Sequence, residues 1–491
     1  MTTSSLPNPV PVPRAPGVDT LWGELWPEPA PRGRPWVVGG ALAAGLLAAV
    51  VVPFREHGVG TFAVLLAVGT VVLLSRGARL TPYLLVVLGL GAPLVATVML
   101  RDAAWVSILC VLAAAGLGVT ALVDARSVVG LVASPLAVSL AALRGMPWLG
   151  RSLRSVGRVG AWWPVLRTAA LSVLLVSVFG ALFASADRLF ATWADRLLPD
   201  LTLDTLALRA FVLLAVAGVT LAVSYAAINP PHVERLAAPA GSPVTRPFEW
   251  LTPVGLLLVL YLGFVAAQLT VMFGGHAYLR STTGLTYAEY VHQGFGQLTV
   301  ATLLTLGVVG VAARKAPRAT ARDRLLLRTV LGALCVLTLV VVASALFRMH
   351  VYEEAYGFTR LRVLVSLFEA WLGLVVLLVL VAGIRLRGTW VPRAAVLSGA
   401  AALLALGAVN PDAYVAERNV ARYAETGKAD WYYLAGLSAD AVPALRELPA
   451  HAQRCVFGPP SAADDDWLEW NLGRARGGTA TLDAGAGCVA R

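Results

Sequence analysis

Long runs of apolar residues constrain this chain more than any other feature of its sequence. About 17 to 25 apolar residues let one α-helix cross the hydrocarbon core of a bilayer, where only a helix satisfies its own backbone polar groups. The sequence therefore predicts an all-α fold, a polytopic transmembrane bundle of about eleven spans. The predicted spans are residues 36–52, 59–74, 82–100, 104–123, 166–186, 206–228, 251–273, 295–313, 325–347, 363–384 and 394–409.

The composition agrees with a membrane protein. Hydrophobic residues make up 58% of the 491 residues, charged residues make up 14%, and the mean hydropathy is +0.74. A soluble core of this length would need more charge to cover its surface. The net charge of +11 does not indicate nucleic-acid binding, because the arginines lie in short loops rather than on one basic face. The lipid bilayer is therefore the expected partner, and nucleic acid is not.

The charges of the loops predict the orientation. A further apolar run, residues 128–143, is short and contains Pro135, so hydropathy does not decide whether it crosses. If it stays on one side, the loops assigned to the cytoplasm hold most of the loop Lys and Arg, as the positive-inside rule requires. If it crossed, the first four spans would flip and Arg76 and Arg79 would lie outside. We therefore expect an interfacial or re-entrant segment in a plasma-membrane protein, with the N-terminus cytoplasmic and the C-terminus extracytoplasmic.

Five sections follow from these patterns. We predict a disordered cytoplasmic arm (1–35), a four-helix membrane section (36–123), a basic re-entrant or interfacial segment on the cytoplasmic side (124–165), a seven-helix membrane section (166–409) and a soluble extracytoplasmic tail (410–491). The tail contains Cys455 and Cys488, which an oxidising exterior would allow to form a disulfide. Two free thiols are equally compatible with the sequence.

Polar residues gather at the outer ends of spans that are distant in sequence. Because charged groups at a bilayer edge gain by pairing, we predict that these residues converge and that a helix starting near Pro411 folds back over them. A network of ion pairs that only locks the bundle is the alternative to a binding site. The candidate ligand-binding residues are Asp187, Tyr287, Glu289, Arg348, Glu353, Tyr356, Arg360, Arg362, Asn410, Asp412, Asn419 and Arg422.

Glu369 lies among apolar residues of the tenth predicted span. A carboxylate in that setting could carry a proton, but Arg362, two turns earlier, could also neutralise it, and we favour this pair. The sequence contains no phosphate-binding G-x-x-x-x-G-K-[ST], no H-E-x-x-H and no C-x-x-C, so we expect no metal site and no cofactor.

Several short strings together resemble a bacterial family of polytopic membrane proteins known as domain of unknown function 4173, which is related to the one numbered 4153. The strings are residues 183–187 (FASAD), 273–275 (FGG), 287–295 (YAEYVHQGF), 356–362 (YGFTRLR), 410–419 (NPDAYVAERN) and 437–445 (LSADAVPAL). The resemblance runs from about the fifth span into the tail. It implies the architecture and no particular activity.

Two functions remain open from the sequence. The first is a binding or scaffold protein of the cell envelope, whose outer-face site recognises a lipid-linked or envelope ligand or another membrane protein. The second is a transporter or membrane-embedded transferase that takes an envelope or lipid-linked anionic substrate at the same site. The missing catalytic motifs favour the first.

Overall fold

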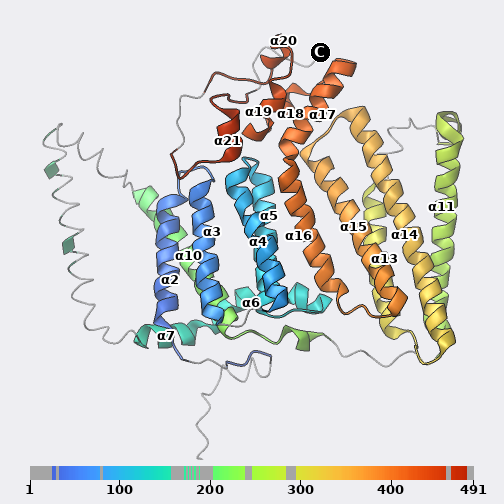
Figure 1. Cartoon of the computed structure of the whole chain (residues 1–491), viewed down its shortest axis with the longest axis horizontal. Coiled ribbons are helices and arrows are strands. Elements are labelled where there is room, and N and C mark those ends of the chain that lie inside the picture. The colour runs from blue at the N-terminus through green and yellow to red at the C-terminus, as the bar shows by residue number, and fades with distance from the viewer. Residues whose placement is uncertain are drawn as a thin grey trace, which may run out of the picture.

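A computed structural model describes residues 25–28, 32–77, 81–155, 203–237, 246–283, 295–460 and 466–483, with a few residues between Thr168 and Asp187. Ten long helices stand side by side in it (Figure 1). They are α2 (Pro35–Val51), α3 (Val59–Arg76), α4 (Pro82–Leu100), α5 (Ala104–Leu122), α10 (Leu203–Ile228), α11 (Phe248–Thr283), α13 (Phe295–Lys315), α14 (Ala321–Tyr356), α15 (Arg360–Arg385) and α16 (Val391–Val409).

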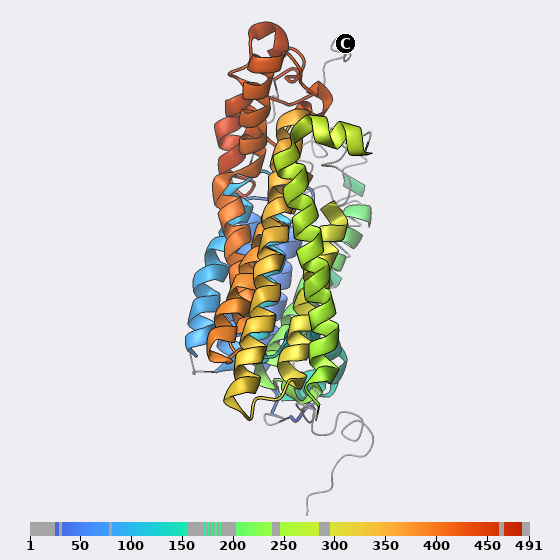
Figure 2. The ribbon, with the colours of Figure 1, turned by 90° about the vertical axis from the view of Figure 1, so that its right-hand side faces the viewer.

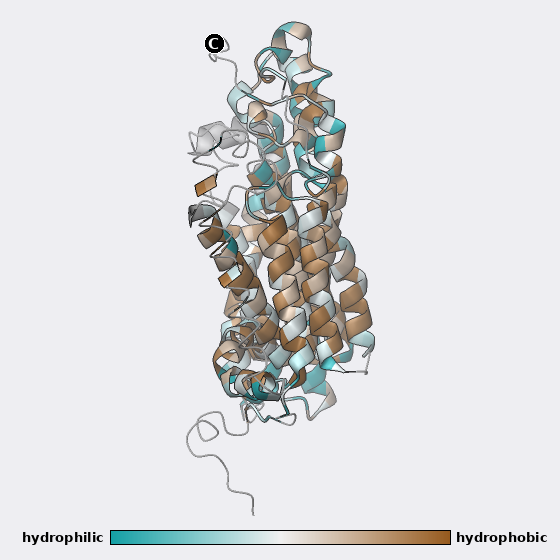
Figure 3. Cartoon of the chain, turned by 90° about the vertical axis from the view of Figure 1, so that its left-hand side faces the viewer, coloured by the Kyte–Doolittle hydropathy of each residue, from teal (hydrophilic) through white to brown (hydrophobic). Residues whose placement is uncertain are grey.

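Nine of these helices in the described residues are long and apolar enough to cross a membrane, and α2 is a shorter apolar helix of 17 residues. Apolar residues cover the middle of the bundle and polar residues cover its two ends (Figure 3). The predicted polytopic all-α bundle is therefore confirmed. The predicted span 166–186 lies mostly outside the described residues.

The bundle packs in three groups of helices. α10 packs against α2 and α3, α16 packs against α4 and α5, and α14 packs against α11, α13 and α15. The last group encloses an apolar core around Leu327 and Leu334 of α14, both almost fully buried. Its helix ends are well defined: Thr320 and Asp323 form a capping box at the start of α14, and Thr359 caps α15.

The run 128–143 forms α6 (Val128–Arg144), and the chain then bends by 51° into α7 (Met146–Ser155). Both helices lie across one end of the upright helices (Figure 1). Ser127 caps α6, and Glu234, in the 3₁₀ helix η1 (Val233–Leu236), accepts hydrogen bonds from the backbone N–H groups of Arg126 and Ser127. The segment therefore has a fixed place beneath the bundle.

The tail covers the opposite end of the bundle, and the side view shows it stacked above the spans (Figures 1 and 2). It comprises α17 (Pro411–Thr426), α18 (Trp431–Ala435), η2 (Ala439–Ala441), α19 (Val442–Leu445), α20 (Ala450–Gln453) and α21 (Leu472–Gly477). Val415, Leu434, Leu445 and Val456 form its own buried core. Cys455 is disulfide-bonded, while Cys488, one of the two cysteines of the tail, lies outside the described residues.

Two local expectations differ from the structure. The outer loop expected from Arg348 onward is instead the last part of α14, which continues to Tyr356 and ends at Gly357, where φ is +86°. Trp26, expected in a disordered arm, is 2% exposed and donates from Nε1 to the carbonyl oxygen of Asn229 at 2.7 Å. Residues 1–24 lie outside the described residues.

Candidate functional site at the junction of tail and bundle

The first contact between tail and bundle is a bidentate ion pair between Arg360, at the start of α15, and Asp412, in the first turn of α17. Arg360 Nε lies 2.8 Å from Asp412 Oδ1, and Nη2 donates to Oδ2. The same carboxylate accepts from Trp105 Nε1 at 3.1 Å and from the backbone N–H of Ser438 at 2.9 Å. Asp412 therefore joins two spans to two segments of the tail, and its side chain is fully buried.

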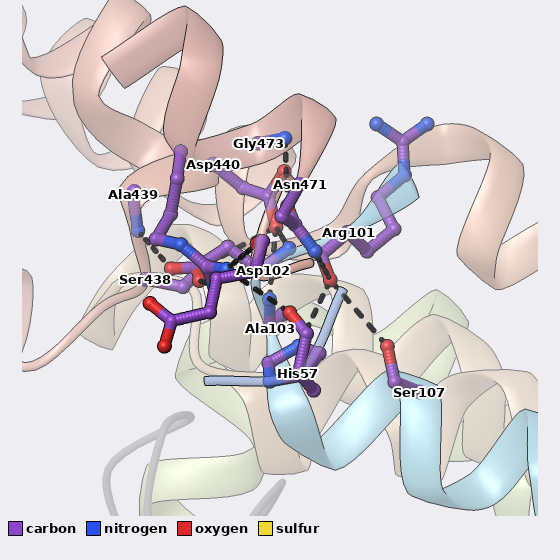
Figure 4. A network of polar contacts seen from close by, with 12 residues as sticks. His57, Arg101, Asp102, Ala103, Ser107, Ser438, Ala439, Asp440, Asn471 and Gly473 are labelled. Carbon is purple, nitrogen blue, oxygen red and sulfur yellow. Dashed lines mark hydrogen bonds and ion pairs between the residues drawn. The ribbon is translucent and has the colours of Figure 1, made fainter. Parts of the chain in front are cut away.

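The second contact is an exchange of caps between Asp102, in the α4–α5 loop, and Asp440, in η2 (Figure 4). Asp440 Oδ2 accepts from the backbone N–H groups of Asp102 and Ala103, at 2.7 and 2.9 Å. Asp102 Oδ2 accepts from the backbone N–H of Ala439 at 2.8 Å. Each carboxylate thus caps the helix that begins beside the other, which fixes the register between tail and bundle.

Three further side chains complete this contact. Asn471 Nδ2 donates to the carbonyl oxygens of Val98 and Arg101, both at 3.0 Å, and so caps the end of α4. Arg474 Nη1 lies 2.8 Å from Asp102 Oδ1. Arg101 Nε and Nη2 donate to carbonyl oxygens at the end of α16. The polar ends of four helices are therefore satisfied by one another.

A cavity of about 290 Å³ lies beside the first contact, where α14 meets α15 and the tail folds over them. Three cationic side chains and one carboxylate line it among aromatic and polar groups. The lining residues are Tyr356, Phe358, Thr359, Arg362, Asn419, Arg422, Lys428, Ala429, Asp430, Tyr433 and Leu434. Four of the twelve candidate residues, namely Tyr356, Arg362, Asn419 and Arg422, thus come together here.

Two of these four side chains use their polar atoms in hydrogen bonds to backbone groups. Asn419 Nδ2 donates to the carbonyl oxygen of Phe358, and its Oδ1 accepts from the N–H of Phe358. Arg422 donates to the carbonyl oxygens of Glu354, Ala355 and Lys428 through its three guanidinium nitrogens. These side chains build the wall of the cavity and cap α14.

Arg362 and Lys428 retain donors that could bind a ligand. Arg362 donates from Nη1 to the carbonyl oxygen of Gly357, and its guanidinium lies 4.5 Å from the centre of the Tyr352 ring. The side chain of Lys428 is exposed, and only its backbone takes part in hydrogen bonds within the described residues. Two cationic groups with unused hydrogen-bond donors therefore face one cavity, a suitable arrangement for an anion.

The other candidate residues that the structure describes do not line this cavity. Arg348 donates to Gln268 between α14 and α11, and Glu353 is buried on α14 with Oε1 unpartnered. Asn410, with φ of +61°, forms the corner between α16 and α17. Neither Asn410 nor Asp412 lines the cavity. Asp187 is exposed, and Tyr287 and Glu289 lie outside the described residues.

The pKa values of the two tail carboxyl groups shift in opposite directions. Burial acts to raise the pKa of Asp412, but the hydrogen bonds and charge of Arg360 outweigh it and hold the pKa below its usual value. Burial raises the pKa of Asp440, and the backbone N–H groups of Ala103 and Asp102 offset this only in part. The difference follows from the presence of one bidentate cation.

Sequence reasoning missed the whole second contact. Asp102, Asp440, Asn471 and Arg474 were not among the candidates, because a lone acidic residue in a short loop resembles an ordinary solvated charge. The available signal was weak: Asp102 is the one carboxylate in the stretch from residue 57 to residue 123. In the described residues no cluster of three metal-ligating side chains occurs.

Comparison with known families agrees with this architecture. The chain matches the family described as Domain of unknown function (DUF4153) over residues 88–448, which is more than half of its length, so the chain belongs to this family. The resemblance to family 4173 thus pointed to a related but different family. The match begins in α4, well before the first string that suggested a family. No curated protein and no solved structure shows significant similarity to the chain.

Proposed function

We propose that this integral membrane protein acts in the cell envelope as a binding protein that recognises an anionic group in the cavity between α14, α15 and the tail. The observation that carries the proposal is the excess of positive charge in the lining of this cavity. Three cations line it, namely Arg362, Arg422 and Lys428, together with one carboxylate, Asp430. The phosphate of a lipid-linked envelope molecule is an anion of this kind. Aromatic Tyr356 and Phe358 would contact the less polar part of such a ligand.

The proposal includes an extracytoplasmic position for the tail. Arg314, Lys315, Arg318, Arg322 and Arg324 gather around the α13–α14 turn, at the end of the bundle opposite the tail. The positive-inside rule assigns that end to the cytoplasm. The disulfide of Cys455 fits an oxidising compartment on the other side. Single cysteines at Ala319 and Ala480 test this: an impermeant thiol reagent applied to intact cells should label only the second.

Thermal unfolding of the full chain in detergent tests the ligand. Inorganic phosphate at constant ionic strength should raise the melting temperature, because a ligand that binds only the folded state at 100 times its Kd adds about 2.7 kcal/mol to stability. Lys428→Gln should lose most of this gain, because the variant lacks one of the cations that line the cavity. The exposed side chain of Lys428 forms no contact needed for folding, so the variant without phosphate should unfold as the wild type does.

Arg418→Gln is the matched control. Arg418, on α17, is an exposed cation like Lys428, but it stacks 5.2 Å from the centre of the Tyr414 ring and does not line the cavity. It should keep the response of the wild type. Equal losses in both variants would mean that phosphate acts through general screening, and the absence of any response to phosphate or to phosphatidylglycerol in nanodiscs would overturn the proposed site.

The transporter alternative has one observation in its favour, the fully buried carboxyl group of Glu369 inside the bundle.

A further inference from the structure

Glu369 occupies an unusual position for a carboxyl group. It lies in the tenth position of α15, and its side chain is 0% exposed. Oε2 accepts a hydrogen bond from the hydroxyl of Thr299 on α13 at 2.9 Å, while Oε1 is buried without a hydrogen-bond partner. The expected pair with Arg362 does not form, because that guanidinium turns toward Gly357 and the Tyr352 ring.

Among the described side chains of the elements that pack against α15, no other charge takes the place of Arg362. α15 packs against α13, α14, α16 and α17. In the described side chains of α13, the cations are Arg314 and Lys315 at its far end, and Arg393 of α16 pairs with Asp124. On α14, Arg348 binds Gln268, Glu353 carries the same sign as Glu369, and His350 pairs with Glu354 at the surface. Asp412 of α17 pairs with Arg360.

An ionised carboxylate without a counter-ion is far more costly in this setting than a neutral acid. Moving a lone ion into an apolar medium costs tens of kcal/mol by Born solvation, whereas an unpaired neutral polar group costs about 2–7 kcal/mol. A neutral carboxyl group keeps its hydrogen bond to the Thr299 hydroxyl, because a hydroxyl can donate or accept. The neutral acid is therefore the favoured form of Glu369 in this setting.

We propose that Glu369 and Thr299 form a proton-binding site inside the bundle, with the proton on the carboxyl group of Glu369. Binding forms one O–H bond with a proton from water, and release restores the carboxylate, so no oxidant or co-reactant is needed. Polar groups continue from this point along α13: Thr302 is fully buried, and the hydroxyl groups of Thr305 and Tyr261 lie 2.6 Å apart. The site goes beyond the anion cavity and shares no side chain with it.

Infrared spectroscopy of the full chain in a lipid bilayer tests this proposal. The wild type at neutral pH should show a carboxylic-acid C=O band that is absent from Glu369→Gln, an isosteric neutral variant that should fold as the wild type does. Thr299→Val should shift this band to higher frequency, because the carboxyl group loses its hydrogen bond to the Thr299 hydroxyl. The control Glu354→Gln, at an exposed pair, should leave the band unchanged.

Two results would overturn the proposal. One is a spectrum in which Glu369→Gln removes only carboxylate intensity, which would show that Glu369 is ionised. The other is a Glu369→Gln variant that melts well below the wild type while Thr299→Val does not, which would indicate a charge pair at this position. Both readouts are independent of phosphate binding, so this proposal can fail while the proposed function holds, and the reverse.

Discussion

Asp412 and Asp440 are both buried carboxylates that hold the tail to the bundle, and they do so by different means. Asp412 has a guanidinium from α15 on both oxygens. Asp440 uses one oxygen for two backbone N–H groups and leaves Oδ1 buried without a partner. The hydrogen bonds of Asp412 include two from a cation, whereas the backbone hydrogen bonds of Asp440 come from neutral N–H groups. This difference predicts which contact is stronger and how each responds to pH.

The largest effect is expected from Asp412→Ala. This change leaves the guanidinium of Arg360 without its partner and removes the acceptor of Trp105 Nε1 and of the Ser438 N–H. Breaking a buried pair from one side costs about 3–5 kcal/mol. The loss should appear as cleavage within the tail at lower urea in pulse proteolysis of the full chain in detergent.

Asp124→Ala is the control for that measurement. Asp124, like Asp412, forms ion pairs, in its case with Arg126 and Arg393. Its side chain is however 58% exposed and lies at the other end of the bundle. An exposed pair contributes about 0–1 kcal/mol, so the tail should keep its resistance. If Asp124→Ala weakened the tail as much as Asp412→Ala, the contact at Asp412 would have no special part in docking.

The sequence was sufficient to predict the bundle and part of the junction, for different physical reasons. Spans are readable because each apolar run must satisfy its own backbone within the bilayer. The convergence of Arg360 with Asp412 was also predicted, since both lie where spans end and the tail begins. The caps at Asp102 and Asp440 could not be predicted, because they depend on how two loops, more than three hundred residues apart, meet in space.

Glu369 illustrates the same limit within the bundle. The spacing of Arg362 and Glu369 along one helix suggested a pair, but side-chain direction decides the contact, and Arg362 turns to the loop at Gly357. Thr299, the actual partner, is seventy residues away. Sequence spacing therefore indicated that Glu369 is unusual without showing how it is bound.

A smaller effect is expected from Asp440→Ala. The variant leaves the backbone N–H groups of Asp102 and Ala103 without an acceptor, and an unsatisfied buried donor costs about 1–3 kcal/mol. Pulse proteolysis of the tail should show a loss that is smaller than for Asp412→Ala. Ser438→Ala removes a long contact of 3.4 Å between its hydroxyl and the Asp440 carboxylate and should have a smaller effect than Asp440→Ala. A loss for Asp440→Ala that exceeds the loss for Asp412→Ala would reverse the ranking of the two contacts.

The smallest effect is expected from Asp440→Asn, and pH reveals it. The amide oxygen can still accept from Asp102 and Ala103, but the side chain no longer ionises. Because the pKa of Asp440 is raised by burial, the folded tail binds this proton more tightly than the unfolded chain does. The corresponding stability is complete at low pH and is lost as pH rises from the unfolded value of about 3.9 through the folded value. The free energy of unfolding of the variant should therefore rise relative to that of the wild type across that pH window. At higher pH the difference between the two should stay constant.

For Asp412→Asn, the difference in stability between wild type and variant should change with pH in the opposite direction. The pKa of Asp412 is lowered in the folded state, where Arg360 outweighs burial, so its contribution is present above about pH 3.9 and is lost as pH falls through the folded value. The difference between wild type and this variant should then shrink toward acid. Parallel slopes for the two variants would show that one shared electrostatic environment, rather than the presence or absence of Arg360, governs both carboxyl groups, and the distinction between the two contacts would fail.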